Sequence, residues 1–282
     1  MFHDVTYGVL HYNPSLDAGA TRAYINAVDS LAQNRSSSLR SEIFLIDQNS
    51  DQELTNTLAK KYGFSSLCLN KNIGISRGIN LLANMARGKY VSLVTSDVIF
   101  PQGLDERLMS VLDADPKIYQ ICPVSDNSSL DHQRSPCAIE DGVLIPNLVQ
   151  ELTIQYWPRT VFDKIGYFDE RWKACYENMD FALRAFLEGG SVVVDQRAFC
   201  HHEHNTTMKS GAIHHAYDGY LPMPNGLDHQ PLLQMWRDKW PNLERYMNHY
   251  DTFTKDMGQT RAAMFFAYSK NVYLPYVQEV PY

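Results

Sequence analysis

The N-terminal third of the chain alternates short apolar runs with amphipathic stretches, and this alternation constrains the fold more than any other feature. The runs have the length of strands, and the stretches between them place hydrophobic residues at helical spacing. Such alternation builds a parallel sheet with right-handed crossovers, and ligands bind these sheets beyond the carboxyl ends of the strands. The sequence therefore predicts an α/β fold, with strands over 5–10, 42–46, 66–69 and 90–94 and helices over 17–33, 51–62 and 75–86.

Cap and turn residues set the limits of these elements. Ser50 and Asp51 are alternative caps for the helix 51–62, because either side chain can accept a hydrogen bond from a free N–H group of the first turn. Gly88 stands where a glycine usually closes a helix and is expected to end the helix 75–86. The run 90–94 is apolar throughout, which is typical of a strand buried on both faces.

The pattern changes after about Pro123. Residues 125–140 are polar and rich in turn residues, so we expect a mobile surface loop there. A helix over 176–187, a strand over 191–194 and a histidine-rich segment follow, and 230–251 has a helical pattern. The chain has no internal repeat and no Gly/Ser linker, which favours one compact unit.

Composition and charge disfavour several functions. The formal net charge is −7 without a long basic run, which argues against binding to nucleic acid or to an anionic membrane. No apolar run approaches the roughly 20 residues that span a bilayer, and the first residues lack the layout of a signal peptide. The five cysteines have neither zinc-ribbon nor redox spacing, so we expect reduced structural thiols and a cytoplasmic protein.

Two common nucleotide-binding motifs are missing from the sequence. Gly88-Lys89 lacks the hydroxyl residue of a phosphate-binding loop, because Tyr90 follows it. No Gly-x-Gly-x-x-Gly follows the first strand, so a dinucleotide site is disfavoured. The polar residues that remain at the strand ends are Asp47, Asn49 and Asp97.

A series of short motifs runs in one order along about 230 residues of the chain. The series comprises Tyr12-Asn13-Pro14, Leu45-Ile46-Asp47-Gln48-Asn49-Ser50, the stretch 70–80, Thr95-Ser96-Asp97, Gly166-Tyr167-Phe168-Asp169-Glu170, Glu177-Asn178-Met179-Asp180 with Leu183-Arg184, and Lys239-Trp240. In this order the motifs resemble those of the inverting family 2 glycosyltransferases. The resemblance implies the GT-A fold, a Rossmann-like nucleotide-binding mixed sheet flanked by helices. It also implies a donor-binding half over 1–123, an acceptor-binding and catalytic half over 124–229, and a helical extension over 230–282.

The implied activity is transfer of a sugar from a nucleotide-diphosphate sugar, with UDP favoured, to an acceptor hydroxyl, as of a glycan. Thr95-Ser96-Asp97 takes the place of the family's Asp-x-Asp motif, so the resemblance makes Asp97 a metal ligand and puts Thr95 and Ser96 at the donor. His202 and His204 fall on one side of an extended chain and would complete the metal site. The implied cofactor is Mn²⁺ or Mg²⁺, because oxygen ligands suit both ions and imidazole also suits Mn²⁺. A turn aspartate and structural histidines are the alternatives.

The resemblance assigns further donor contacts to the loops after the first three strands. Asp47 would hold the base, and Asn49 or Asp51 the ribose, although Asp51 is equally suited to cap a helix. Arg77 follows a turn glycine and would meet a phosphate, or else lie exposed on a helix surface. The other residues assigned to the donor are Tyr12, Asn13 and Asn72.

Inversion needs a base that takes the proton of the acceptor hydroxyl as it attacks. In the family this base is commonly the aspartate after the glutamate, and here that position is Asn178, which cannot accept a proton at neutral pH. The role then falls to Glu177 or Asp180, which project toward one face at the start of a helix, and the choice between them stays open. An acidic turn on a surface helix is the alternative.

Four further residues are assigned to the acceptor. Asp169 and Glu170 would orient acceptor hydroxyls, or satisfy a turn. Trp157 and Trp172 would stack on a sugar, although core packing is the more frequent use of such rings.

Two other functions compete with glycosyl transfer. A sugar-phosphate nucleotidyltransferase has a similar sheet, but it needs a glycine-rich basic loop after the first strand, which residues 11–15 do not provide. A degenerate, non-catalytic GT-A protein that binds a glycan or a partner is the other alternative, because Thr95 and Asn178 replace expected acids.

Overall fold

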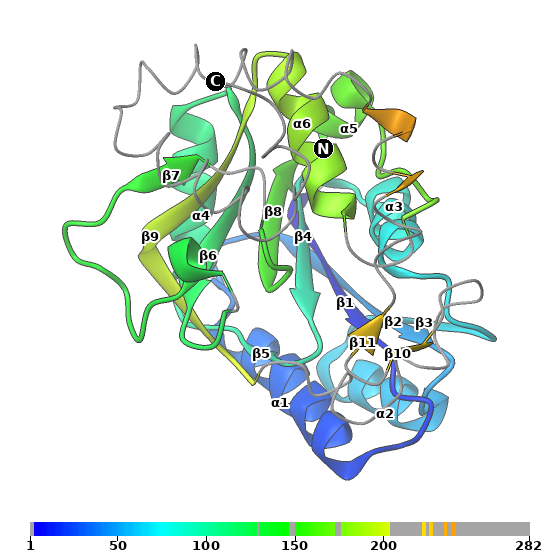
Figure 1. The fold of residues 1–282 in the computed structure, drawn as a ribbon. Coiled ribbons are helices and arrows are strands. Elements are labelled where there is room, and N and C mark those ends of the chain that lie inside the picture. The colour runs from blue at the N-terminus through cyan, green and yellow to red at the C-terminus, as the bar shows by residue number, and fades with distance from the viewer. Residues whose placement is uncertain are drawn as a thin grey trace.

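The computed structural model of the protein describes residues 3–128, 130–146, 150–172 and 176–203, with short pieces at 222–223, 226–227, 234–235 and 238–240. A mixed sheet of nine strands forms its centre, and helices flank the sheet (Figure 1). The α/β fold expected from the alternating pattern is therefore confirmed.

The N-terminal part of the sheet consists of four parallel strands joined by helices. Its elements are β1 (His3–His11), α1 (Ala18–Asn34), β2 (Ser41–Gln48), α2 (Gln52–Tyr62), β3 (Ser65–Leu69), α3 (Ile75–Met85) and β4 (Gly88–Thr95). Asp17 caps α1 by accepting a hydrogen bond from the Ala20 N–H group at 2.9 Å. Asp51 caps α2 in the same way, through the Leu54 N–H group at 2.9 Å, so Asp51 rather than Ser50 is the cap.

The rest of the described chain completes the sheet with strands of mixed direction. Its elements are β5 (Val98–Ile99), α4 (Leu104–Ala114), β6 (Ile118–Ser125), η1 (Asp131–Gln133), β7 (Leu144–Pro146), β8 (Ile154–Pro158), α5 (Thr160–Ile165), α6 (Glu177–Leu187), β9 (Ser191–His202), β10 (Pro222–Met223) and β11 (Gly226–Leu227). The strand order is β3-β2-β1-β4-β8-β6-β9-β5, and β7 pairs with β9 beside this path. β8 is antiparallel to β4, whereas β6 and β9 run parallel to each other.

Side chains of the sheet alternate between two hydrophobic cores. In β4, Val91 and Leu93 pack into the core formed with α3, α5 and α6, and Tyr90 and Val94 pack into the core formed with α1, α2 and α4 (Figure 1). Burial on both faces explains why this strand is apolar throughout. The carboxyl ends of β1, β2 and β4 are left free of helix packing and carry the loops that matter for the site.

The structure corrects two expected element boundaries. α3 ends at Met85, and Gly88 begins β4 instead of closing the helix. A Cβ atom at Gly88 would lie 2.6 Å from the backbone nitrogen of Thr6 on β1, so the glycine permits close strand pairing there. The strand expected over 191–194 continues to His202.

The segment 125–140 was expected to be a surface loop, and part of it is built into the fold. It contains η1, and the side chains of Gln133 and Ser135 are buried. The division proposed at 123/124 falls inside β6, so the two halves share one sheet.

Some predictions concern parts of the chain that are described only in fragments or not at all. His204 and Cys175 lie outside the described residues, as does nearly all of the helical extension 230–282. The other four cysteines, Cys68, Cys122, Cys137 and Cys200, are free thiols. Among the described helices, none has both the length and the apolar character needed to cross a membrane.

Candidate active site

Parallel pairing brings the polar strand ends of the N-terminal half to one edge of the sheet. His11 of β1 is level with Asp47 of β2, and Leu10 is level with Thr95 of β4. The loops after these strands therefore start side by side, as the rule for parallel sheets predicts.

Asp97 and His202 form the centre of this edge. Asp97 lies in the turn between β4 and β5, and β5 pairs with the end of β9 so that Val98 is level with His202. The backbone oxygen of Asp97 accepts a hydrogen bond from the Glu203 N–H group at 2.8 Å, which fixes the turn. The His202 Nε2 atom lies 3.3 Å from Oδ1 of Asp97. The structure thus brings together two of the three predicted metal ligands.

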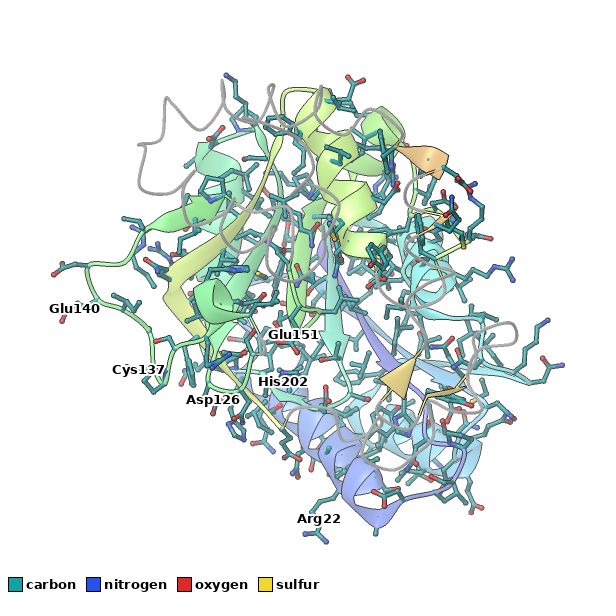
Figure 2. All side chains as sticks on the ribbon, in the orientation of Figure 1. Arg22, Asp126, Cys137, Glu140, Glu151 and His202 are labelled. Atoms are coloured by element: carbon teal, nitrogen blue, oxygen red, sulfur yellow. The ribbon has the colours of Figure 1, made fainter. Side chains whose placement is uncertain are left out.

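The imidazole of His202 is buried and faces several negative charges. Burial lowers its pKa, but the hydrogen bond and the charge of Asp97 outweigh burial and raise the pKa above its ordinary value, with further contributions from Glu151 and Asp126. Asp126 also accepts the His202 N–H group at 3.0 Å and pairs with the ring of His201. Figure 2 shows Asp126, Glu151 and His202 in one part of the molecule, and Glu140 further out on the protruding loop.

Sequence reasoning missed Asp126 and Glu151. Asp126 directly follows β6, so its place at a strand end was an available signal. Glu151 stands in the approach to β8, a strand that the periodicity did not reveal, and nothing in the sequence pointed to it.

The donor atoms of Asp97 and His202 are of the types that bind divalent cations. No group of three His, Cys, Asp or Glu side chains within the described residues is arranged to enclose a metal ion. Asp97 and His202 nevertheless offer one carboxylate and one imidazole 3.3 Å apart, a donor pair that suits Mn²⁺. The Thr95 hydroxyl is buried without a hydrogen-bond partner in the described structure, and it adds a neutral oxygen beside the pair.

The loops after β1 and β2 are held together by their own polar side chains. Asn13 is fully buried, accepts from the Asp17 N–H group at 3.0 Å and donates to the Thr21 hydroxyl at 3.0 Å. Asp47 is also fully buried, accepting from the Ser50 N–H group at 2.6 Å and the Thr55 hydroxyl at 3.0 Å. Burial raises the pKa of Asp47. In this structure both side chains are buried and engaged by their own loops, and their assignment to the donor stays a prediction.

Other predicted donor residues remain accessible. Asn49 is exposed, with a left-handed φ of 72°. Tyr12 is half-buried and its hydroxyl is hydrogen-bonded to Asn72, whose Oδ1 atom accepts the Gly74 N–H group at 2.8 Å. Burial raises the pKa of Tyr12. These side chains border the same loops as Asp97, although Asp51 is committed to capping α2.

Arg77 and Glu170 contact each other rather than standing apart. Arg77 Nε donates to Glu170 Oε2 at 3.0 Å, and Asn80 Nδ2 reaches the same carboxylate at 3.3 Å. Asn80 also brackets the backbone of Phe168, accepting from its N–H group and donating to its oxygen at 2.9 Å each. The predicted phosphate ligand and the predicted acceptor residue thus join α3 to the turn before residue 172.

The two acids at the start of α6 differ completely in their surroundings. Asp180 is fully buried with both oxygens committed: Arg184 Nε lies 3.0 Å from one, and Lys239 Nζ at 2.5 Å and Trp240 Nε1 at 3.1 Å contact the other. Glu177 is 6% exposed, and its Oε2 atom has no hydrogen-bond partner among the described residues. Burial raises the pKa of Glu177 to about 7. Asp180 is therefore held by ion pairs and hydrogen bonds, whereas Glu177 is a buried carboxyl with a raised pKa and an oxygen that is unengaged among the described residues.

The remaining acceptor predictions are corrected by burial and ion pairing. Trp157 and Trp172 are fully buried in the core beneath α6, so in this structure neither ring has a face free to stack on a sugar. Asp169 pairs with Arg171 at 2.6 Å and with Lys239 at 2.8 Å, and the bonds from Arg171 outweigh burial and lower its pKa. Asp169 thereby anchors Lys239 to the turn before α6.

Comparison with known structures places this arrangement among the glycosyltransferases. Residues 1–349 of TarS from S. aureus match 98% of this chain and 74% of that one, with 14% identity and a TM-score of 0.61. The same TarS fragment in complex with UDP-GlcNAc matches over 70% of this chain and 58% of that one, with 16% identity and a TM-score of 0.53. GalNAc-T7 with UDP, GalNAc and Mn²⁺ matches over 71% and 44%, with 13% identity and a TM-score of 0.56. These likenesses confirm the GT-A fold, and no curated protein sequence matches the chain.

The sequence itself gives the family. The model of glycosyl transferase family 2 matches residues 25–176, more than half of the chain. The protein belongs to glycosyl transferase family 2 and is a glycosyltransferase, as its motifs implied.

Proposed function

We propose that the protein transfers a sugar from UDP to an acceptor hydroxyl of a glycan, with inversion and with the help of a divalent metal ion. The observation that carries the proposal is the Asp97–His202 pair at the carboxyl end of β4, 3.3 Å apart and facing two further carboxylates. A carboxylate and an imidazole this close favour a bound cation, and a cation at this strand edge would meet the diphosphate of a donor.

UDP is the proposed carrier of the sugar. TarS is known in complex with UDP and with UDP-GlcNAc, and GalNAc-T7 with UDP, GalNAc and Mn²⁺. In this chain Tyr12, Asn72 and Asn49 provide one aromatic ring and two amides around the loops where the nucleoside would lie. Aromatic faces and amide groups are suited to a pyrimidine and its ribose.

Asp97 and His202 would hold the metal ion, Mn²⁺ or Mg²⁺, with Thr95 and Ser96 beside it. A divalent ion at this position neutralises charge that develops on the leaving diphosphate. Because Thr95 supplies no charge, Asp97 is the only carboxylate of its motif, and His202 compensates as a second ligand.

Glu177 is the proposed general base. In the reaction the acceptor oxygen bonds to the anomeric carbon, the bond from that carbon to the diphosphate breaks, and Glu177 takes the acceptor proton. A carboxyl with its pKa at about 7 and a free oxygen is suited to this step. Asp180 is less suited to the role, because Arg184, Lys239 and Trp240 engage both of its oxygens.

The test is release of UDP from UDP-sugars, with and without an acceptor glycan and Mn²⁺, for the wild type and Asp97→Ala. We expect metal-dependent turnover that Asp97→Ala lowers by at least about a hundredfold, and a smaller loss in Thr95→Ala. Asp163→Asn, which changes an exposed carboxylate on α5, is the control and keeps full activity. Full metal-dependent activity in Asp97→Ala would show that the site is misplaced.

A non-catalytic glycan-binding role is the second candidate, because Thr95 and Asn178 stand where acids are expected. Isothermal titration with UDP, with UDP-sugars and with oligosaccharides separates the two functions. Binding of oligosaccharide without consumption of any UDP-sugar would support the binding role and end the catalytic one.

A further inference from the structure

Five buried amide side chains form a layer between the two ends of the candidate active site. We call them the amide layer: Gln120, Gln133, Gln150, Gln155 and Asn178, each at most 8% exposed. They come from β6, η1, the approach to β8, β8 itself and α6. Buried amides at this density are unusual for a core, because each must recover the hydrogen bonds it would make in water.

Hydrogen bonds connect the layer from one end to the other. Asn178 Nδ2 donates to the backbone oxygen of Gln150 at 2.8 Å. Gln120 Nε2 donates both to Gln150 Oε1 at 3.1 Å and to Gln155 Oε1 at 2.7 Å, so Gln120 is the branching point. Gln155 Nε2 then donates to the backbone oxygen of Glu151 at 3.0 Å.

The far end of the layer is held from a second direction. Gln133 Nε2 donates to the same Glu151 oxygen at 3.1 Å, and the Glu151 N–H group donates to Gln133 Oε1 at 2.9 Å. Glu151 is one of the carboxylates whose charge acts on His202. The layer therefore begins at the residue after Glu177 and ends at a residue that faces the Asp97–His202 pair.

Stability alone does not account for this layer. Gln120 Oε1, Gln150 Nε2 and Asn178 Oδ1 are buried without a hydrogen-bond partner among the described residues. Each such atom loses the hydrogen bond it would make in water, whereas apolar side chains of the same volume would carry no such cost. Polar networks of this kind make an arrangement rigid and unique, which is valuable where two groups must keep a fixed separation.

We propose that the amide layer is a positioning device that fixes the first turn of α6, and with it Glu177, relative to Glu151 and the Asp97–His202 pair. This inference rests on the proposed function, in which Glu177 and the diphosphate stand on opposite sides of the reacting carbon. The start of α6 needs such support, because its N-cap Tyr176 is left-handed at φ 63° and provides no side-chain cap. In-line displacement depends on that separation, and a misplacement of about 1 Å can cost about a hundredfold in rate.

Gln120→Met tests the proposal, because it removes both donated hydrogen bonds at nearly constant volume. Tyr7→Phe is the matched control: it deletes a buried hydrogen bond, from the Tyr7 hydroxyl to Asp105 at 3.0 Å, in the opposite core. The measurements are kcat and KM for the UDP-sugar, the share of sugar transferred to acceptor rather than to water, and Tm. We expect kcat for transfer to fall at least about tenfold and the share lost to water to rise, with KM for the donor within about twofold.

Tyr7→Phe should keep kcat and the transfer share at wild-type values even where its Tm falls as much. Asn178→Leu, which cuts the link at the edge of the layer, should repeat the pattern of Gln120→Met and serves if that variant does not fold. Equal behaviour of Gln120→Met, Asn178→Leu and Tyr7→Phe would overturn the proposal and leave the layer as packing. A wild type without turnover is a different result, since it removes the proposed function and this inference with it.

Discussion

The segment from the end of β2 to the start of α2 and the segment that begins α6 contain the same parts and use them in opposite ways. Each leads into a helix, contains a buried acid and has a non-glycine residue in the left-handed conformation, Asn49 or Tyr176. In the first segment both oxygens of Asp47, at the end of β2, accept hydrogen bonds, and Asp51 caps the helix. At α6 the cap is absent and Glu177 has an oxygen without a partner in the described structure.

The difference teaches how to separate structural from reactive acids. A buried carboxylate whose oxygens are all engaged contributes to stability and has no lone pair left for a substrate. A buried carboxyl with an unengaged oxygen reduces stability when it ionises, and it is thereby prepared to gain a proton. Four predictions test this contrast, in order of decreasing effect.

Glu177→Gln should have the largest effect on activity. The amide keeps the shape of the side chain but cannot take a proton, so kcat for transfer should fall by about 10²–10⁴-fold. The free energy of unfolding should stay the same or rise, because no buried charge remains to be desolvated. Steady-state kinetics and urea denaturation measure the two quantities, and a fall in stability with kept activity would contradict the assignment.

Asp47→Ala should have the opposite profile. Its loss leaves the Ser50 N–H group and the Thr55 hydroxyl without their acceptor, at a cost of roughly 1–3 kcal/mol in the free energy of unfolding. Asp47→Asn keeps one acceptor and should lose less. Urea denaturation of both variants gives the comparison, and a purely kinetic defect would restore Asp47 to a direct role at the donor.

Ionisation of Glu177 should make activity and stability change in opposite directions with pH. Burial raises its pKa from 4.5 to about 7, so the fold favours the neutral form; the stability it contributes is complete below pH 4.5 and is lost as pH rises through about 7. Activity needs the ionised form, so kcat should fall about tenfold for each pH unit below that pKa. Rate and denaturation profiles from about pH 5 to pH 8 check both signs. In Glu177→Gln the free energy of unfolding should lose this part of its pH dependence.

Asn49→Gly should have the smallest effect. Asn49 is exposed and left-handed at φ 72°, a conformation in which glycine is unstrained and asparagine is tolerated. The free energy of unfolding should change by less than about 1 kcal/mol. If KM for the UDP-sugar rises while the free energy of unfolding is unchanged, the Asn49 side chain contacts the donor. An unchanged KM would mean that Asn49 serves only to form the turn.

Local patterns predicted the N-terminal half of the fold because its strands and helices are long and strongly periodic. Asp51 was recognisable as a cap, and the family motifs located Asp97 and Glu177. The pattern did not reveal β5, β7 and β8, since strands of two to five residues leave little periodicity, and their partners lie far along the chain.

The errors at the site also arise from tertiary contacts. Gly88 was expected to end a helix, but it is needed for the close approach of the β1 backbone, which the sequence pattern does not report. From the sequence, Trp157 and Trp172 were expected to stack on a sugar, but both rings are buried in a core that they share with residues of α6. The difference between Glu177 and Asp180 arises in part from Lys239 and Trp240, which contact Asp180 and lie far beyond α6 in sequence. No motif reports such distant neighbours.

The pairing of β5 with the end of β9 has a consequence for the growing chain on the ribosome. Asp97 belongs to the first half of the sequence, but its partner His202 is synthesised only after the whole of β9. The N-terminal strands can therefore assemble while the turn that holds Asp97 still lacks its neighbour. The Asp97–His202 pair would then form late in synthesis, when the end of β9 is added to the sheet beside β5.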